Sequence, residues 1–317
     1  MKFAAALLAA TVSADIATKL RYIEHLSKFN KQYLSMAEFE ARLEHFAKAD
    51  AIVEEHNAQN STYFLRHNIL SDLTEEERAQ YRGKLPSENV EFRNTTSLNT
   101  DSLPSSVDWR GTAVNSIQDQ AQCGSCWAFS ATCALEGAHY IATGKLEKFA
   151  EQQLVDCDSQ CYGCGGGWAY AGFVYWESTP AILKSDYAYT ARDGTCKVGQ
   201  VAATETVVTG YTWVTPKSSS AAKAAIAQQP VSVAIEADQY VFQLYGGGVF
   251  DNTSCGTYLD HAVALVGYGS ENGQDYFILR NSWGTSWGDE GYMKIADVGD
   301  SAGICGVLSE PVWPTSN

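Results

Sequence analysis

The first 122 residues contain no cysteine, although nine cysteines follow from position 123 onward. The chain also has no run of lysine or arginine, and its formal net charge is −15. Because binding to nucleic acid requires clustered basic side chains, this charge balance argues against a nucleic-acid partner. Hydrophobic residues make up 45% and charged residues 19% of the chain, so disorder is not the default. The cysteine distribution indicates two parts, of which only the second is adapted to an oxidising compartment.

Long apolar runs are absent as well. Residues 3–10 are apolar, but this run is far shorter than the roughly 20 residues that a membrane helix needs, so no membrane span is expected. Lys2 precedes the run and a small-residue cleavage site follows at 12–14, which predicts a secretory signal peptide over residues 1–14. We expect the protein to enter the secretory pathway and to reach a lysosome or acidic vacuole, or the outside of the cell. Compatible Asn-x-Ser/Thr sequons begin at Asn60, Asn94 and Asn252.

Glycine and proline are missing from residues 15–57, where the pattern is helical. Ser35 with Glu38 three residues later is typical of a capping box. A short strand is expected over 63–70, and Ser71 followed by acidic residues predicts a second helix start. Apolar residues at spacings of three and four predict one amphipathic helix face: Phe39, Leu43, Phe46, Ala49 and Val53.

Residues 83–106 are polar and aperiodic, which indicates an extended linker where proteases cut. A buried helix is predicted from Ser125, as its N-cap, to Gly144, as its stop. A helical half followed by a β-rich half suggests two lobes within residues 103–317. The strands are expected at 231–235, 262–266, 276–279 and 292–295, between glycine-rich turns.

Reactive side chains concentrate in the segment Gln120–Ser130, where Cys123 and Cys126 are three residues apart. Four interpretations compete: a structural disulfide, half of a zinc site, a redox Cys-x-x-Cys pair, and a catalytic nucleophile. Cys126 is the first residue of the predicted helix, and a helix N-terminus favours the thiolate that a nucleophile needs. The hypothesis that Cys126 is a nucleophile therefore depends on finding a histidine that can activate it.

Only one of the six histidines is placed to do so. Four precede the linker, and His139 is 13 residues along the same helix, about 20 Å away at 1.5 Å per residue. His261 remains, in an apolar segment where a buried structural histidine would be the ordinary interpretation. The absence of a rival histidine in the cysteine-rich part favours His261 as the base.

Three separated motifs resemble the papain-like cysteine proteases, with a cathepsin L-like layout. Cys123-Gly-Ser-Cys126-Trp127 is the local signature of that family, and His261 and Asn281 follow Cys126 by 135 and 155 residues. The resemblance covers the chain beyond the signal peptide. It implies an α+β papain-like fold, with a helical left lobe, a β-barrel-like right lobe and the active-site cleft between them. The implied activity is that of a cysteine endopeptidase, made as an inactive zymogen.

The resemblance assigns catalytic roles. Cys126 attacks the peptide carbonyl as a thiolate, and His261 pairs with it and later protonates the leaving amine. Asn281 fixes the imidazole orientation, and Trp283 shields that hydrogen bond from water. Gln120 donates its side-chain amide to the oxyanion, together with the backbone N–H of Cys126. No metal or cofactor is implied.

The resemblance also implies a substrate pocket and a disulfide map. Gly166 and Gly167 fit a backbone ledge for an extended peptide. Alanines at the pocket walls and Glu310 at its floor suggest that the residue two before the cut is apolar, aromatic or Arg, with Arg declining as Glu310 is protonated. The implied substrate-binding set is Gly166, Gly167, Trp168, Ala169, Ala234, Leu259, Asp260, Ala262, Trp283 and Glu310. The implied disulfides are Cys123–Cys164, Cys157–Cys196 and Cys255–Cys305, and of the alternatives for Cys133 and Cys161 a mutual bond is favoured over two free thiols.

The region before the linker resembles a cathepsin L-like inhibitory proregion. The expected division is a signal peptide at 1–14, a propeptide at 15–102 and a catalytic domain at 103–317. Implied partners are protein and peptide substrates, the propeptide as inhibitor and cystatin-type inhibitors, for a monomeric enzyme. The ERFNIN helix spacing is followed by Glu38, Arg42, Phe46, Val53 and Asn57, whereas Ala49, Arg66 and Leu70 depart from the usual motifs and Asn68 and Asp72 retain them.

Two rival classes stay open at this point. A thiol–disulfide oxidoreductase could use Cys123 and Cys126, but no thioredoxin-type βαβ pattern surrounds them. A non-catalytic homologue is expected to lack Cys126, His261 or Asn281, and all three are present. The absence of an insertion between Cys164 and Cys196 favours an endopeptidase over an exopeptidase.

Overall fold

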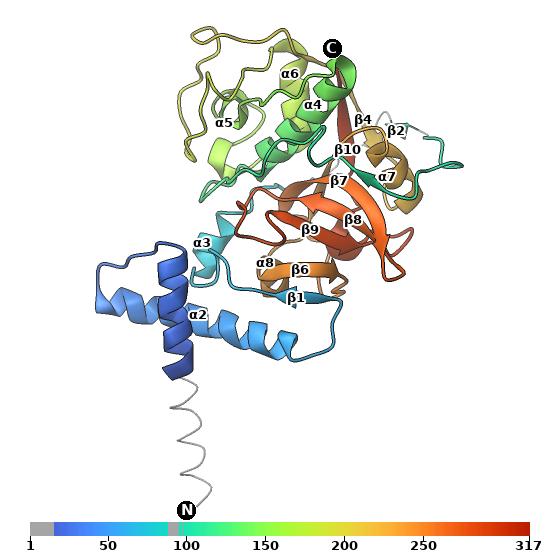
Figure 1. The fold of residues 1–317 in the computed structure, drawn as a ribbon. Coiled ribbons are helices and arrows are strands. Elements are labelled where there is room, and N and C mark those ends of the chain that lie inside the picture. Colours follow the sequence, from blue (N-terminus) through green and yellow to red (C-terminus); the bar gives the residue numbers. More distant parts are fainter. Residues whose placement is uncertain (1–15, 88–94, 97) are drawn as a thin grey trace, which may run out of the picture.

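The computed structural model describes residues 16–317 except 88–94 and 97 (Figure 1). The predicted signal peptide and the sequon at Asn94 lie outside the described residues. The first part is helical over 16–28 and continues with α2 (Met36–Asn57), β1 (Tyr63–Leu65), α3 (Glu75–Ala79) and β2 (Thr95–Thr96). The second part holds β3 (Val107–Asp108), α4 (Cys126–Thr143), α5 (Glu151–Cys157), α6 (Ala169–Ser178), β4 (Val208–Val214), α7 (Ser219–Ile226), β5 (Val231–Ile235), α8 (Tyr240–Gln243), β6 (Tyr245–Phe250), β7 (His261–Glu271), β8 (Gln274–Arg280), β9 (Tyr292–Ala296) and β10 (Val312–Ser316).

The helices and strands separate into two lobes, which confirms the predicted α+β architecture. Figure 1 shows α4, α5 and α6 together at one end and the strands β6 to β9 beyond them. The strands run in the order β1-β6-β9-β8-β7-β5-β10-β4-β2, with β3 added to β7. The β5–β7 and β7–β8 pairs are antiparallel, whereas β6 pairs with β9 in parallel. Helix α4 packs on β7 and β10, so it forms the seam between the lobes.

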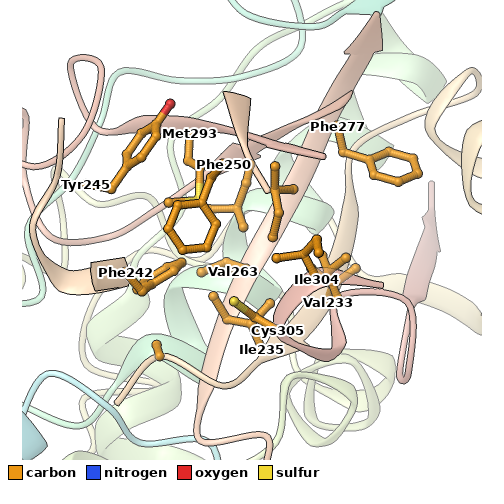
Figure 2. Packing of buried hydrophobic residues seen from close by; sticks show 14 of the residues in the cluster. Val233, Ile235, Phe242, Tyr245, Phe250, Val263, Phe277, Met293, Ile304 and Cys305 are labelled. Carbon is orange, nitrogen blue, oxygen red and sulfur yellow. The ribbon is translucent and has the colours of Figure 1, made fainter. Parts of the chain in front are cut away.

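A large apolar cluster stabilises the β-rich lobe. Every residue of β5 is buried, which explains its run of β-branched and small side chains. Figure 2 shows how side chains from β5, β6, β7, β8 and β9 gather there with others from α8 and the C-terminal region. The labelled members are Val233, Ile235, Phe242, Tyr245, Phe250, Val263, Phe277, Met293, Ile304 and Cys305.

Helix α4 has the predicted bounds, but its start differs in detail from the expectation. Gly144 ends the helix in the left-handed region at φ 72°, as a C-terminal glycine does. Ser125 occupies the N-cap position, yet its side chain makes no capping hydrogen bond. Its hydroxyl lies instead 2.7 Å from the hydroxyl of Tyr189. The first turn is therefore tied to a distant loop and is not capped locally.

The first part packs along the β-rich lobe through strand pairing. Strand β1 pairs with β6, so it extends the sheet by one short strand (Figure 1). Ser35 accepts a hydrogen bond from Glu38 N, which is one of the two bonds of the predicted capping box. The complete capping box lies at Thr74 and Glu77, and the next helix begins there and not at Ser71. The Ser71 hydroxyl accepts a hydrogen bond from Asn68 N, which explains why it does not cap a helix.

Arg66, which departs from the proregion motif, and Asn68, which retains it, both bind the second part of the chain directly. Arg66 stands where glycine is usual, and its guanidinium donates to Gly288 O at 2.6 Å. Asn68 donates to Gln243 O at 2.7 Å and is itself buried. The departure at Arg66 therefore adds an anchor between the two parts. Within the described ranges, no helix is both apolar enough and long enough to cross a membrane.

Candidate active site

Cys126 and His261 lie at the starts of two elements that pack against each other. Cys126 begins α4 and His261 begins β7. The Ala262 N–H is directed at Cys126 Sγ, at a nitrogen–sulfur distance of 3.4 Å. One turn further along α4, the Ser130 hydroxyl donates to Val263 O at 2.6 Å, which fixes the helix against the strand. The fold thus places the Cys126 thiol against the residue next to His261, although Cys126 and His261 are 135 residues apart in the sequence.

The imidazole of His261 is held on two sides. Its Nε2 lies 2.8 Å from Asn281 Oδ1, so this nitrogen carries a proton. The Trp283 ring stacks on the imidazole with 4.7 Å between centroids and an interplanar angle of 30°. His261 Nδ1 is buried and has no hydrogen-bond partner among the described residues. Because Nε2 is protonated, Nδ1 is the atom available to exchange a proton.

Gln120 is fully buried, and both ends of its side-chain amide are fixed. Ser282 donates its hydroxyl to Gln120 Oε1 at 2.6 Å. Gln120 Nε2 donates to Tyr81 O at 3.0 Å and to Cys123 O at 2.9 Å. Tyr81 belongs to the first part of the chain, and its carbonyl also accepts from Trp283 Nε1 at 3.0 Å. A carbonyl oxygen of the first part therefore occupies the amide donor of Gln120.

The segment around Gly83 fills the cleft, so the predicted free linker is wrong at its start. Gly83 N–H is directed at Cys126 Sγ at 3.2 Å, and Gly83 O accepts from Gly167 N at 2.8 Å. Leu85 N in turn donates to Gly167 O at 3.2 Å, which completes a short backbone ladder. A side chain at Gly83 has no space, because a Cβ there would lie 1.8 Å from Gly124 O. The ledge at Gly166 and Gly167 thus carries an extended peptide, which is a segment of the same chain.

Two basic side chains flank Gly83 and pair with carboxylates in the cleft. Arg82 Nε lies 3.0 Å from Asp260 Oδ2, and Lys84 Nζ lies 3.0 Å from Glu310 Oε2. The Lys84 side chain is only 5% exposed, so its charge is removed from water. Burial raises the pKa of Asp260 to about 6, although the Ala237 N–H and the Arg82 guanidinium act against this.

Lys84 reaches into a pocket that contains half of the expected substrate-binding set. Glu310 lies at this pocket, whereas Asp260 faces Arg82 and Trp283 lies on the other side of the site, over His261. Leu259 is half-buried and lies outside the pocket lining. The predicted residues in the lining are Trp168, Ala169, Ala234, Ala262 and Glu310, and those that the sequence did not indicate are Tyr170, Trp213, Ser232, Val233 and Val312. The added residues come from α6 and from three strands that meet only in the folded chain.

Burial changes the acid–base behaviour of the central pair. It raises the pKa of the Cys126 thiol to about 11, although hydrogen bonds from Ala262 N–H and Gly83 N–H act in the opposite direction. Burial also lowers the pKa of His261 to about 3, although the hydrogen bond to Asn281 favours the protonated form. With the Gly83 segment in place, burial thus favours the neutral form of both groups.

The cysteines form three disulfides: Cys123–Cys164, Cys157–Cys196 and Cys255–Cys305. Cys126 is unpaired, and since Cys123 is bonded to Cys164, the two cysteines of the Cys-x-x-Cys segment do not form a redox pair. The favoured bond between Cys133 and Cys161 is wrong, because both are free. Cys133 faces Arg280 beneath α4, whereas Cys161 lies near Gly167 and Trp168.

Comparison with known families identifies two regions of the chain. The model described as papain family cysteine protease matches residues 103–315, and the model described as cathepsin propeptide inhibitor domain (I29) matches residues 22–78. Cysteine proteinase RD21A of Arabidopsis thaliana is 43% identical over 291 residues, which cover 89% of this chain. The chain spans 63% of the length of that relative.

Solved structures of precursors have the same fold over nearly the whole chain. A recombinant stem bromelain precursor superposes with a TM-score of 0.87 at 35% identity and covers 94% of this chain and 99% of its own. Digestive procathepsin L 3 from the larval midgut of Tenebrio molitor superposes with a TM-score of 0.84 at 34% identity, with the same coverage. Both likenesses include the first part of the chain together with the second.

Proposed function

The chain belongs to the papain family of cysteine proteases and carries a cathepsin-type propeptide inhibitor domain before its protease domain, and from this premise we propose that it is the zymogen of an endopeptidase whose catalytic pair is Cys126 and His261. One observation carries the proposal. A thiol at a helix start lies against the strand whose first residue is an imidazole already oriented by Asn281. The propeptide is proposed to span residues 15–102 and the catalytic domain residues 103–317.

Catalysis begins when the propeptide leaves and water enters the cleft. The thiol proton moves to His261 Nδ1, and the resulting ion pair is stabilised by solvent and by the start of α4. The thiolate of Cys126 attacks the carbonyl carbon, and the oxygen takes up the negative charge. That oxyanion accepts hydrogen bonds from Gln120 Nε2 and from the Cys126 N–H. The geometry of Gln120 supports this role, since its Nε2 already binds the carbonyl of Tyr81.

Collapse of the tetrahedral intermediate breaks the C–N bond. His261 gives its Nδ1 proton to the leaving amine, and an acyl-enzyme remains on Cys126. A water molecule then transfers a proton to His261 as its oxygen attacks the thioester carbonyl. The C–S bond breaks, the carboxylic acid leaves, and the thiolate and imidazolium are regenerated. The ring of Trp283 supports the role of Asn281, because it covers the imidazole to which Asn281 is hydrogen-bonded.

The direction in which the propeptide binds explains why it inhibits and is not cut. The Cys126 sulfur faces the N–H of Gly83, whereas Gly83 O accepts from Gly167 N. The propeptide atom that faces the sulfur at this residue is therefore an amide nitrogen, and the segment runs parallel to Gly167 in the Lys84–Gly167 bridge. Its backbone hydrogen bonds occupy the ledge, which supports its role as an inhibitor of its own catalytic domain.

Substrate preference is proposed to reside in the pocket that Lys84 fills. Its aromatic and alanine walls suit an apolar or aromatic side chain, and Glu310 suits an Arg or Lys side chain. The Lys84–Glu310 ion pair supports the second preference, because a basic side chain already occupies the pocket in the zymogen. We therefore propose an endopeptidase that accepts both apolar or aromatic and basic residues two before the cut.

We also propose a location and a set of partners for the enzyme. Passage through the secretory pathway to an acidic vacuole or to the outside is supported by the family and by three disulfides, which persist in oxidising compartments. Protein and peptide substrates and cystatin-type inhibitors are the expected partners of a monomeric enzyme.

Covalent labelling tests the proposal. The full chain is activated at acid pH and incubated with an epoxysuccinyl inhibitor, and the adduct is located by mass spectrometry. We expect one adduct, on Cys126, with complete loss of peptide cleavage and no adduct in Cys126→Ala. Cys133 and Cys161 serve as internal controls, because both are buried free thiols outside the catalytic pair. Absence of an adduct together with insulin-reductase activity would overturn the proposal.

A further inference from the structure

Tyr189 connects the two ends of the loop that carries the proposed oxyanion donors. Its hydroxyl donates to Gln120 O at 2.8 Å and lies 2.7 Å from the Ser125 hydroxyl. A phenol has a single proton, which is directed at Gln120 O, so the Ser125 hydroxyl must be the donor in the second hydrogen bond. This bond also explains why Ser125 makes no capping hydrogen bond at the start of α4.

We propose that Tyr189 is a positioning residue for the oxyanion site, an inference that rests on the proposed function. The two donors of that site come from opposite ends of the loop: the side-chain amide of Gln120 and the backbone N–H of Cys126. Tyr189 binds the backbone oxygen of Gln120, whose side chain is the first donor. It also binds the hydroxyl of Ser125, which immediately precedes Cys126, the residue of the second donor. It therefore fixes the distance between the donors from outside the cleft.

The surroundings of Tyr189 make this restraint rigid. Gln120 and Ser125 are fully buried, so neither can replace its bond to Tyr189 with bulk water. The tyrosine ring meets the ring of Phe129 edge-on, with 4.9 Å between centroids and an interplanar angle of 81°. Phe129 is on the first turn of α4, so the ring and the hydroxyl of Tyr189 both contact the helix start.

A second link between the ends of the loop runs inside it, since Cys123 O accepts from Gln120 Nε2 at 2.9 Å and from Ser125 N at 2.7 Å, whereas Tyr189 binds both ends from outside. Ser282 binds Gln120 through Oε1 and through the backbone N–H, which orients the residue relative to β8 and not relative to α4. The Cys123–Cys164 bond ties the middle of the loop to the ledge. Without the Tyr189 hydroxyl, Gln120 O loses the only side-chain donor that also contacts the start of α4 in the described structure. We expect the two oxyanion donors to lose their fixed spacing, while Cys126 Sγ keeps its contact with the Ala262 N–H and His261 keeps its hydrogen bond to Asn281.

A positioning role for Tyr189 predicts that peptide hydrolysis and alkylation of Cys126 respond differently to its substitution, whereas a general structural role predicts that both fall. Peptide hydrolysis needs the oxyanion donors, whereas alkylation of Cys126 by iodoacetamide needs only the thiolate. In Tyr189→Phe, made in the full chain and activated at acid pH, we expect kcat for a fluorogenic peptide to fall about tenfold with little change in KM. This loss is smaller than the roughly 10²–10³ observed when a donor is removed outright. The rate of Cys126 alkylation and its pH profile should not change.

Tyr187→Phe is the matched control. Tyr187 is in the same loop and donates its hydroxyl to Asp156 Oδ2 at 2.6 Å, away from Gln120 and Ser125. Its kcat/KM should stay within about twofold of the parent enzyme, as is usual for a change outside the reacting groups. If Tyr189→Phe fails to fold, Ser125→Ala removes the second bond of the bridge and should lower kcat in the same direction.

The outcomes distinguish the inference from the function on which it rests. An unmodified chain that cleaves no peptide overturns the proposed function itself. An active parent enzyme with equal kcat values for Tyr189→Phe and Tyr187→Phe overturns the role of Tyr189. Equal losses in hydrolysis and in Cys126 alkylation overturn it too, because they would show general damage to the site.

Discussion

Replacing Gly83 by alanine should release the catalytic site without altering any residue of the catalytic domain. The backbone of Gly83 is not in the left-handed region, so alanine adds no conformational strain there. The obstacle is space. A Cβ at this position would lie 1.8 Å from Gly124 O, and real Cβ contacts are essentially never shorter than 3.0 Å. The propeptide must therefore move by about 1.2 Å, which is the difference between these two distances.

A movement of that size breaks the short ladder that holds the segment in the cleft. The bonds at risk are Gly167 N to Gly83 O (2.8 Å), Leu85 N to Gly167 O (3.2 Å) and Gly83 N to Cys126 Sγ (3.2 Å). Each contributes about 1 kcal/mol net, so their loss weakens propeptide binding by about 2–3 kcal/mol. This corresponds to a population of open precursor that is roughly 30- to 150-fold larger.

The assay measures access to Cys126 before any processing occurs. Uncut precursor is incubated with an epoxysuccinyl inhibitor at pH 7, and the rate at which Cys126 acquires the label is followed by intact mass. Gly83→Ala should be labelled faster than the parent by the factor given above. Gly210→Ala is the matched control, because a Cβ there meets only Thr315 Oγ1 at 3.5 Å. Labelling of Gly83→Ala at the parental rate would refute the steric account of the cleft.

Two further predictions concern the pocket and the pH of activation. In Glu310→Gln, kcat/KM for substrates with Arg two before the cut should fall by about 10- to 100-fold, because the partly buried guanidinium loses its carboxylate partner. Substrates with Phe at that position should be unaffected. An unchanged Arg-to-Phe ratio would contradict the role proposed for Glu310 from its ion pair with Lys84. Burial within the propeptide lowers the pKa of His25, against the effect of Asp72, so the unfolded propeptide binds more protons than the folded one below about pH 6.5. The propeptide fold therefore loses stability as the pH falls through that range, and His25→Phe should shift the midpoint of activation, measured from pH 4 to pH 7, to lower pH. An unshifted midpoint would exclude His25 as an acid trigger.

Elements with strong local signals could be predicted closely from the sequence. Helix α4 is bounded by Cys126 and Gly144, and the residue types at both ends indicate the boundary. Strand β6 was not predicted, since three consecutive glycines from Gly246 interrupt its apolar pattern. Those glycines have a long-range cause: a Cβ on Gly246 or Gly247 would lie within 3 Å of the ring of Phe64. The pattern reflects propeptide docking, which a local window cannot contain.

The candidate site likewise contains residues that the sequence predicts and residues that it does not. Four site residues could be proposed from the sequence, because each lies in a short motif of neighbouring residues: Cys126, Gln120, His261 and Asn281. Segment 83–87 was interpreted as free linker, because polar and aperiodic residues carry no local sign of the partners that bind them. Tyr189 gave no signal at all. Its importance depends on two hydrogen bonds to residues more than 60 positions away, and these exist only in the folded chain.

In the precursor, the propeptide covers the proposed catalytic residues while the side-chain hydrogen bonds that orient them are already in place. The hydrogen bond between His261 and Asn281 is already 2.8 Å long, and the Gln120 amide is already fixed by Ser282. In the covered site, burial raises the pKa of Cys126 to about 11 and lowers that of His261 to about 3. Both shifts favour the neutral form, because an ion pair is poorly solvated beneath a peptide that offers it few hydrogen bonds. We therefore expect removal of the cover to favour the charged pair through solvation, and at the same time to free the Gly167 backbone and the Nε2 of Gln120 for substrate.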